Sequence, residues 1–267
     1  MDEFLNPDIF GEIQSYLTPY ERIRGRSTGL FTPDEEAIYY VTGSQRIPDW
    51  VRKIQTGPEA EDEDIMHLDL TYLDINFNNN ITNRSLSLFD NLKVLNAGIN
   101  NMITDDALIS PLISLTIPAI NKTRLFEDAK GRVRFAFTNN IVPHISTLEF
   151  LNLHSNQTGI RDLGLLYNLK VLYVPQFIED KNLVGLDNLE ELHLTYNQTI
   201  TDVGIFSLPR LKYLFIDYNA NVTGLVTLLP LLEMVDLGHS RIRKKNIKNL
   251  DIIIQREGRI YDKKDIY

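Results

Sequence analysis

Residues 189–219 read LEELHLTYNQTITDVGIFSLPRLKYLFIDYN and contain the pattern L-x-x-L-x-L-x-x-N twice, with the two copies 22 residues apart. In each copy the segment x-L-x-L alternates leucine or isoleucine with other residues, which is typical of a strand with one buried face. A single short strand cannot bury its own leucines, so repeats of this kind are stable only when they stack on one another. The stretch therefore predicts a repeat protein.

The same pattern, complete or degraded, recurs along most of the chain at spacings of 20 to 22 residues, with one gap of 36. Copies start at Leu70, Leu92, Leu112, Leu148, Leu169, Leu189, Leu211 and Leu232. Within the long gap, RVRFAFTNN from Arg132 has apolar residues at matching offsets, and we interpret it as a ninth, degenerate copy. One short strand per copy is expected, centred near Leu73, Leu95, Leu115, Phe135, Leu151, Leu172, Leu192, Leu214 and Val235.

Asparagine ends each complete copy, and its side-chain amide can bond to backbone groups that a turning chain leaves unpaired. We expect these asparagines to form hydrogen bonds along the stack. The 11 to 13 residues that lead from such an asparagine to the next complete copy are too few for a long helix. They predict a single helical turn or a piece of 3₁₀-helix on the far side of each repeat.

The repeated pattern resembles that of leucine-rich repeat proteins over roughly residues 65–250. The resemblance implies an α/β solenoid: a curved parallel sheet of about eight or nine short strands, preceded by a small helical N-terminal region. Ile-Thr-Asp follows the asparagine at residues 200–202 and 103–105, as it does in members of this family that also carry an F-box.

The amino-terminal residues 5–17, LNPDIFGEIQSYL, are of a different kind. Asn6 and Pro7 suit a helix start, and the apolar residues fall on one stripe of a helix. The segment is similar to the opening of an F-box, which implies that a Skp1-like adaptor binds Leu5, Ile9, Ile13 and Leu17. The alternative is an amphipathic helix that only caps the first repeat, since the apolar end of a solenoid must be covered.

We divide the chain accordingly. Residues 1–64 are interpreted as a helical F-box-like or capping region that ends in an acidic linker, residues 59–64. Residues 65–267 are interpreted as the leucine-rich repeat solenoid with a basic C-terminal cap.

The composition excludes several classes of function. The 267 residues include no cysteine, so disulfides, cysteine-ligated zinc and thiolate catalysis are absent. A net charge of −9 argues against nucleic-acid binding, which needs many cations for the phosphates. There is no signal peptide and no run of eighteen apolar residues, so we expect no membrane span and an intracellular, cytoplasmic location, in the host cytoplasm if the source is viral.

No motif for catalysis, phosphate binding or metal binding is present, so we expect no catalytic residues, no metal and no cofactor. His154, His193 and His239 lie at outward positions of repeats that are two strands apart. The resulting spacing of roughly 10 Å is too wide for one ion.

What remains is the outward face of the strands, on the predicted concave side. From the fifth copy onward this face is rich in aromatic residues. Side chains of this kind dominate protein–protein hot spots, although stacked aromatics can also serve only as cross-strand packing. We predict a partner-binding site formed by Phe150, Tyr173, His193, Tyr196, Tyr213, Phe215 and Tyr218.

The sequence thus predicts a non-catalytic module that recognises a protein partner on its concave face. The F-box resemblance implies, further, a substrate receptor of an SCF-like ubiquitin ligase. The alternative is a structural or scaffold leucine-rich repeat protein in a larger assembly, whose N-terminal helix only caps the solenoid.

Overall fold

The computed structural model describes residues 38–43, 46–98, 100, 102–107, 112–116, 125–127, 133–135, 137–154, 159–174, 176–240, 242, 246, 253–256 and 259–261. The chain forms two compact units, Met1–Tyr39 and Tyr40–Tyr267. The segment 5–17, with the predicted adaptor residues, lies outside the described residues. The second unit holds the repeats.

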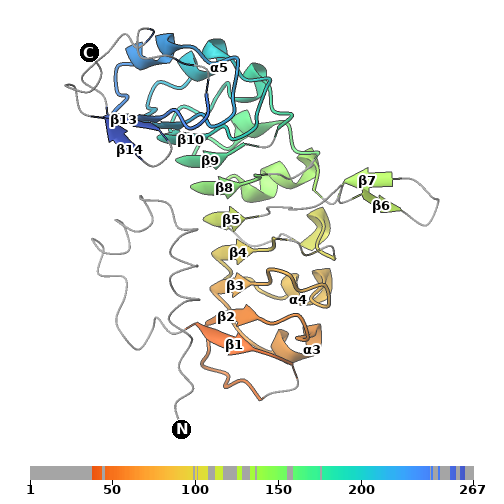
Figure 1. Cartoon of the computed structure of the whole chain (residues 1–267). Helices are drawn as coiled ribbons and strands as arrows, with labels where there is room; N and C mark the ends of the chain where they lie inside the picture. The colour runs from red at the N-terminus through yellow and green to blue at the C-terminus, as the bar shows by residue number, and fades with distance from the viewer. Residues whose placement is uncertain are drawn as a thin grey trace. The chain divides into compact units, whose positions relative to one another are not determined.

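Short parallel strands stacked in chain order form the main sheet of the second unit (Figure 1). Each strand, together with the segment that returns to the next, is called a rung below. The parallel series is β2 (Lys53–Thr56), β3 (Tyr72–Asp74), β4 (Val94–Asn96), β5 (Ser114–Thr116), β8 (Phe150–Asn152), β9 (Val171–Tyr173), β10 (Glu191–His193), β11 (Tyr213–Phe215), β12 (Met234–Asp236) and β13 (Ile253–Arg256). The predicted solenoid is confirmed.

The central residues of strands β3 to β12 face inward, pair with one another across the sheet and form one row of the buried core. Leu172, Leu192 and Leu214 are consecutive partners and are fully buried. The strands predicted around Leu73, Leu95, Leu115, Leu151, Leu172, Leu192, Leu214 and Val235 are all present at those positions.

The strand predicted around Phe135 is not part of this sheet, and that prediction is wrong. β7 (Val133–Phe135) pairs antiparallel with β6 (Leu125–Glu127) in a separate hairpin, while β5 pairs directly with β8. Thr116 and Thr138 are 22 residues apart, whereas the equivalent residues of the preceding rung, Asn96 and Thr104, are 8 apart. The long gap therefore reflects a hairpin inserted into one rung, whose alternating apolar residues imitate a repeat.

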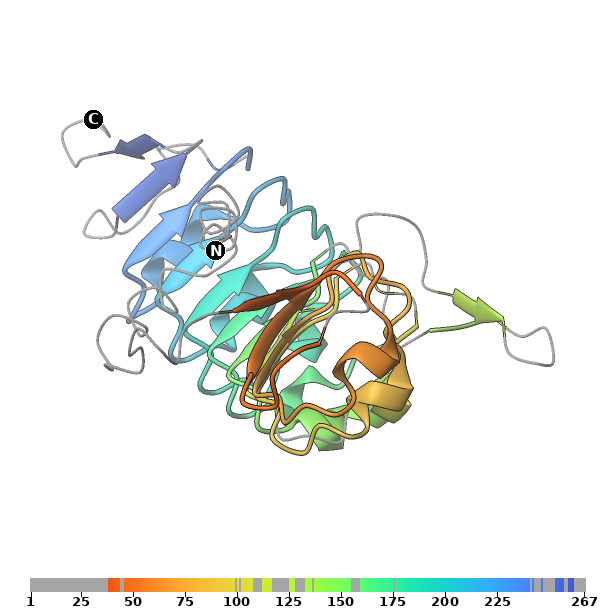
Figure 2. The ribbon, with the colours of Figure 1, turned by 90° about the horizontal axis from the view of Figure 1, so that it is seen from below.

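Single helical turns or short pieces of 3₁₀-helix return the chain on the side of each rung opposite the strands, as predicted (Figures 1 and 2). Three are α-helical and five are 3₁₀-helices among the described residues. They are α3 (Asp62–Ile65), α4 (Asn83–Leu86), α5 (Asp202–Phe206), η1 (Asp105–Ala107), η2 (Asn139–Ile145), η3 (Leu163–Leu165), η4 (Asp180–Asn182) and η5 (Gly224–Leu228).

The asparagines that end the repeats form the predicted hydrogen bonds along the stack. Asn78, Asn197 and Asn219 are buried, and each side-chain amide donates to a carbonyl of the preceding rung. The Asn197 Nδ2 lies 2.9 Å from the Ile178 carbonyl oxygen, while its Oδ1 accepts from the Ile200 backbone N–H at 2.8 Å. One amide therefore satisfies backbone groups of two rungs, which explains why this position is polar although it is buried.

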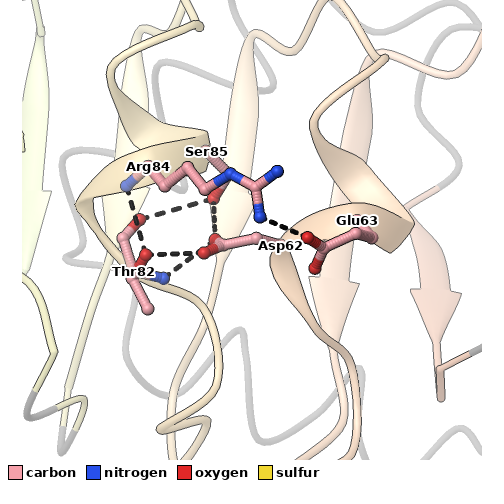
Figure 3. Close-up of polar contacts among 5 residues, drawn as sticks. All are labelled: Asp62, Glu63, Thr82, Arg84 and Ser85. Carbon is pink, nitrogen blue, oxygen red and sulfur yellow. Dashed lines mark hydrogen bonds and ion pairs between the residues drawn. The ribbon is translucent and has the colours of Figure 1, made fainter.

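A second row of polar contacts joins the return segments, and the sequence analysis did not anticipate it. The Thr82 hydroxyl donates to Asp62 Oδ2 at 2.5 Å, the Thr82 N–H donates to Asp62 Oδ1, and the Ser85 hydroxyl adds a third bond (Figure 3). Thr82 Oγ1 also accepts from the Arg84 N–H, so it caps α4, and the Arg84 guanidinium pairs with Glu63. Equivalent threonine–aspartate pairs join residues 105 and 138, 180 and 201, and 202 and 223.

The solenoid begins earlier than the sequence predicted. β1 (Tyr39–Val41) and β2 precede β3 in the sheet, and α3 lies within the predicted acidic linker. Asp62 is buried, and its carboxylate accepts hydrogen bonds from Thr82 and Ser85 that compensate for the loss of water. At residues 53–64, therefore, the chain is a rung of the solenoid and not a solvated linker.

The predicted basic C-terminal cap contains two strands. β13 continues the parallel sheet beside β12, and β14 (Arg259–Tyr261) pairs antiparallel with β13. The reversal of direction ends the parallel series. Among the described residues, no helix has the length and apolar character needed to span a bilayer.

Candidate functional site

The candidate site lies on the outer face of the sheet, opposite the leucine core, on β8 to β12. Because side chains alternate along a strand, the first and third residues of each strand face outward and form two rows across the sheet. In the row of third residues, Tyr173, His193, Phe215 and Asp236 are consecutive partners.

The rings of Tyr173, His193 and Phe215 form a continuous stack that Phe150 extends beyond Tyr173. We call these four rings the first ring stack. The His193 ring is sandwiched between Tyr173, with ring centroids 3.7 Å apart, and Phe215, at 4.0 Å. Both neighbours are within 9° of parallel to the imidazole. Phe150 continues the stack at a tilt of 56° and 5.8 Å from Tyr173. These rings fix one another's orientation on the sheet.

A buried carboxylate holds the imidazole in the plane of this stack. His193 Nε2 lies 2.6 Å from Glu191 Oε1, and only 3% of the Glu191 side chain is exposed. Burial lowers the pKa of His193 below its ordinary value, although the hydrogen bond to Glu191 and the charges of Glu191 and Asp236 oppose that shift. The lowered pKa favours the neutral imidazole, in which Nε2–H donates to the Glu191 carboxylate.

A second ring stack follows the ends of the strands. It consists of Tyr196, Tyr218 and His239, with successive centroids 4.7 and 4.4 Å apart. Tyr196 and Tyr218 have φ angles of 59° and 54°, in the left-handed region that non-glycine residues rarely adopt. The two tyrosine residues are 47% and 41% exposed, so the second ring stack presents surface to solvent.

A pocket of about 250 Å³ lies between the ends of the two ring stacks. The first stack contributes His193 and Phe215, and the second contributes His239. The remaining lining residues are Thr195, Asp217, Asp236 and Gly238.

The two aspartates of the pocket are held by backbone and side-chain donors. Asp217 Oδ1 accepts from the His239 N–H at 2.7 Å and lies 2.9 Å from His239 Nδ1. Asp236 Oδ1 accepts from the Gly238 N–H at 2.9 Å. A Cβ on Gly238 would lie 2.4 Å from Asp217 Oδ1, and Gly238 has a φ of 43°, so only glycine leaves room for this carboxylate.

The structure brings most of the predicted partner-binding residues together. Tyr173, His193 and Phe215 form the first ring stack, and Tyr196 and Tyr218 belong to the second. The remaining two, Tyr213 and Phe150, have different environments.

Tyr213 and Phe150 lie in the neighbouring row of first strand residues. The Tyr213 hydroxyl donates to Glu233 Oε2 at 2.9 Å, and partial burial, together with that bond, raises the pKa of Tyr213. Phe150 is only 6% exposed, so it supports the first ring stack and offers little surface to a partner.

Sequence reasoning missed the pocket itself. Nothing in the repeat pattern indicates that a hollow lined by Asp217 and Asp236 separates the two ring stacks. The available signal was Gly238, which occupies a position where the two preceding rungs carry Thr195 and Asp217.

In the first half of the sheet the row of third strand residues is polar: Gln55, Asp74, Asn96 and Thr116 are consecutive partners. Asp74 accepts hydrogen bonds from the Asn76 N–H at 2.9 Å and from Asn96 Nδ2 at 3.1 Å. Burial nevertheless raises the pKa of Asp74 to about 6. Two further buried acceptors on the same row, Gln55 Oε1 and Asn96 Oδ1, have no hydrogen-bond partner among the described residues.

Comparison with known proteins identifies the fold. The sequence matches no family model and no curated protein. An internalin of Listeria monocytogenes is similar in structure over 88% of this chain and 73% of its own, with 20% identity and a TM-score of 0.53. The mouse RP105/MD-1 complex is similar over 80% of this chain and 41% of that chain, with 19% identity and a TM-score of 0.57. The fold is a leucine-rich repeat solenoid.

Proposed function

We propose that this chain is a non-catalytic recognition module that binds a protein partner on the outer face of β8 to β12. One observation carries the proposal: two ring stacks flank a 250 Å³ pocket, and the tyrosines of the second stack are almost half exposed. Rigid aromatic side chains with polar tips are the residues that most often anchor protein interfaces. Their ordering in stacks before binding reduces the entropy lost when a partner docks.

Affinity capture with the whole chain, followed by calorimetry on the captured partner, tests this proposal. Tyr218→Ala or Phe215→Ala should weaken binding by roughly 1 to 3 kcal/mol, as truncation of an anchor does. Tyr167→Ala is the matched control, because Tyr167 is 57% exposed but lies in the segment between η3 and β9. Equal small effects of all three variants would show that the rings only pack against one another.

We further propose, on the sequence resemblance alone, that residues 5–17 bind a Skp1-like adaptor and that the chain is a substrate receptor of an SCF-like ubiquitin ligase. Co-purification with such an adaptor tests this, and Ile9→Asp with Ile13→Asp should abolish it. If the adaptor binds neither the parent chain nor the variant, the chain is better described as a scaffold whose N-terminal helix is a cap.

A further inference from the structure

The pocket between the ring stacks has the chemistry of a site for one basic side chain. One face of the Phe215 ring is covered by His193. The next residue of that row is Asp236 rather than another ring, so the first ring stack ends at the pocket. A planar cation can lie over an aromatic face, and the interaction is strongest where water is partly excluded.

The carboxylates of the pocket have unused hydrogen-bonding capacity. Asp217 and Asp236 each use Oδ1 for the contacts described above, and the Oδ2 atoms have no partner among the described residues. Two carboxylate oxygens beside a ring face match the fork of N–H donors that a guanidinium presents.

The lysines that immediately precede β11 and β9 are paired with glutamates. Lys212 Nζ lies 3.0 Å from Glu190 Oε2, and Lys170 Nζ lies 2.9 Å from Glu149 Oε2. The pocket itself contains no lysine or arginine among the described residues. Within the described part of the chain, His239 Nδ1 contacts Asp217 only at Oδ1, and Asp236 Oδ1 is bound only by the Gly238 N–H, so both Oδ2 atoms stay available to a cation.

The size of the pocket also indicates a single side chain. Small-molecule sites usually enclose about 300 to 1,000 Å³ and are lined mainly by apolar residues. This pocket has about 250 Å³, and five of its seven lining residues carry a polar or charged side chain: His193, Thr195, Asp217, Asp236 and His239.

We propose that this pocket receives an arginine side chain of the protein partner, with the guanidinium over the Phe215 ring and paired with Asp217 and Asp236. This inference rests on the proposed recognition function and specifies the partner as a basic segment. Phe215 supplies the stacking surface, and Gly238 provides the space in which the Asp217 carboxylate sits.

Selection of a random peptide library, displayed on phage, against the whole chain tests the inference. Enriched peptides should share an arginine, and the double variant Asp217→Asn, Asp236→Asn should not enrich them. Glu233→Gln is the matched control, since it removes one carboxylate from the same part of the sheet but outside the pocket. It should select the same peptides as the parent chain.

Calorimetry on one selected peptide then separates charge from shape. Replacing its arginine by the neutral isostere citrulline should weaken binding at least tenfold to the parent chain and less than twofold to the double variant. A lysine in the same place should bind with intermediate affinity, because an ammonium cannot stack or form the fork. Equal affinities of the arginine and citrulline peptides, or a selection that enriches no arginine-containing peptide, would overturn the inference.

Two further variants keep the outcomes distinguishable. If the arginine of the peptide has no effect but Phe215→Ala still weakens binding, the pocket assignment fails while the proposed recognition face stands. If neither the arginine nor Phe215 affects binding, the pocket assignment and the recognition face both fail. Neutralising the chain's own basic segment, with Arg243, Lys244 and Lys245 changed to glutamine, should leave peptide affinity unchanged. A gain in affinity would show that the chain fills its own pocket and would overturn the assignment to a partner.

Discussion

Asp74→Asn is expected to stabilise the protein at neutral pH. Burial raises the pKa of Asp74 to about 6, from an ordinary value of 3.8, so ionisation of this carboxyl opposes folding. Between these two pKa values the folded protein binds a proton that the unfolded chain does not, and stability therefore falls as pH rises through this window. A difference of about 2 pKa units corresponds to about 3 kcal/mol above pH 6.

The surroundings of Asp74 suit an amide. The Oδ1 atom of an asparagine can still accept from the Asn76 N–H. Its NH₂ group replaces the Oδ2 atom that accepts from Asn96 Nδ2, and a flip of the Asn96 amide lets the otherwise unpaired Asn96 Oδ1 accept from this new donor. The free energy of unfolding should be measured by urea denaturation at several pH values from 4 to 8. The gain of the variant over the parent should grow from well under 1 kcal/mol at pH 4 to about 3 kcal/mol at pH 7.

The pH dependence is the decisive part of this measurement. Asp90→Asn is the control, because Asp90 is exposed and outside the row, and its effect should be small at every pH. A difference between Asp74→Asn and the parent that stays constant with pH, or a variant less stable than the parent at pH 7, would refute the reasoning.

Three other substitutions test the packing of the rungs, with thermal and urea unfolding as the measurements. Leu192→Ala removes a fully buried side chain from the middle of the core and should cost about 2 to 5 kcal/mol. Asn197→Ala leaves the Thr199 and Ile200 N–H groups without their acceptor and removes one of the donors to the Ile178 carbonyl, so it should cost about 3 kcal/mol. Thr201→Ala removes both the cap of α5 and the bond to Asp180, and a loss of about 1 to 2 kcal/mol is expected; no loss would show that this row of contacts is incidental.

The repeat pattern determined most of the fold because each leucine and asparagine has a fixed role. A leucine that must face the core and an asparagine that must bond to the preceding rung define where each strand begins and ends. The first rung escaped detection because Val51, Ile54 and Thr56 occupy positions where the pattern expects leucine. These β-branched residues occupy the same buried positions, but they differ from the leucine of the consensus sequence, so the repeat pattern does not reveal them.

In the inserted hairpin, by contrast, the repeat pattern predicted a strand of the main sheet that is not there. Val133 and Phe135 alternate with polar residues, and alternation alone does not tell whether a strand joins the main sheet or pairs with its neighbour in the chain. The hydrogen bond between Asp105 and Thr138, which are 33 residues apart, shows that the hairpin is an insertion and not a rung. That contact places the return of the next rung after the hairpin, and it follows from the threonine–aspartate row rather than from the leucines.

The candidate site was predictable as a row of residues but not as a geometry. Outward positions with aromatic side chains could be read from the repeat, and Tyr173, His193 and Phe215 do stack. The pocket depends on features that periodicity does not encode. These are the left-handed backbone at Tyr218, the close approach of Asp217 to Gly238, and the end of the ring series at Phe215.

His193 should make stability depend on pH in the direction opposite to Asp74, although both lie in the same row of third strand residues. Burial lowers the pKa of His193, so on acidification the unfolded chain takes up a proton at the ordinary pKa while the folded protein does not. Stability therefore rises with pH up to the ordinary pKa of histidine, about 6.5, and falls on acidification below it.

His193→Gln tests this in the Asp74→Asn background, where the opposing titration is absent. Glutamine keeps a donor for Glu191 but neither titrates nor stacks as a ring, so the variant should be less stable at pH 7. Between pH 7 and pH 5 the double variant Asp74→Asn, His193→Gln should nevertheless lose less stability, measured by urea denaturation, than the single variant Asp74→Asn. Equal losses in these two proteins would mean that His193 is protonated as readily in the folded chain as in the unfolded one. In that case the first ring stack would contain an imidazolium, and the attraction of the pocket for a basic side chain would weaken as pH falls.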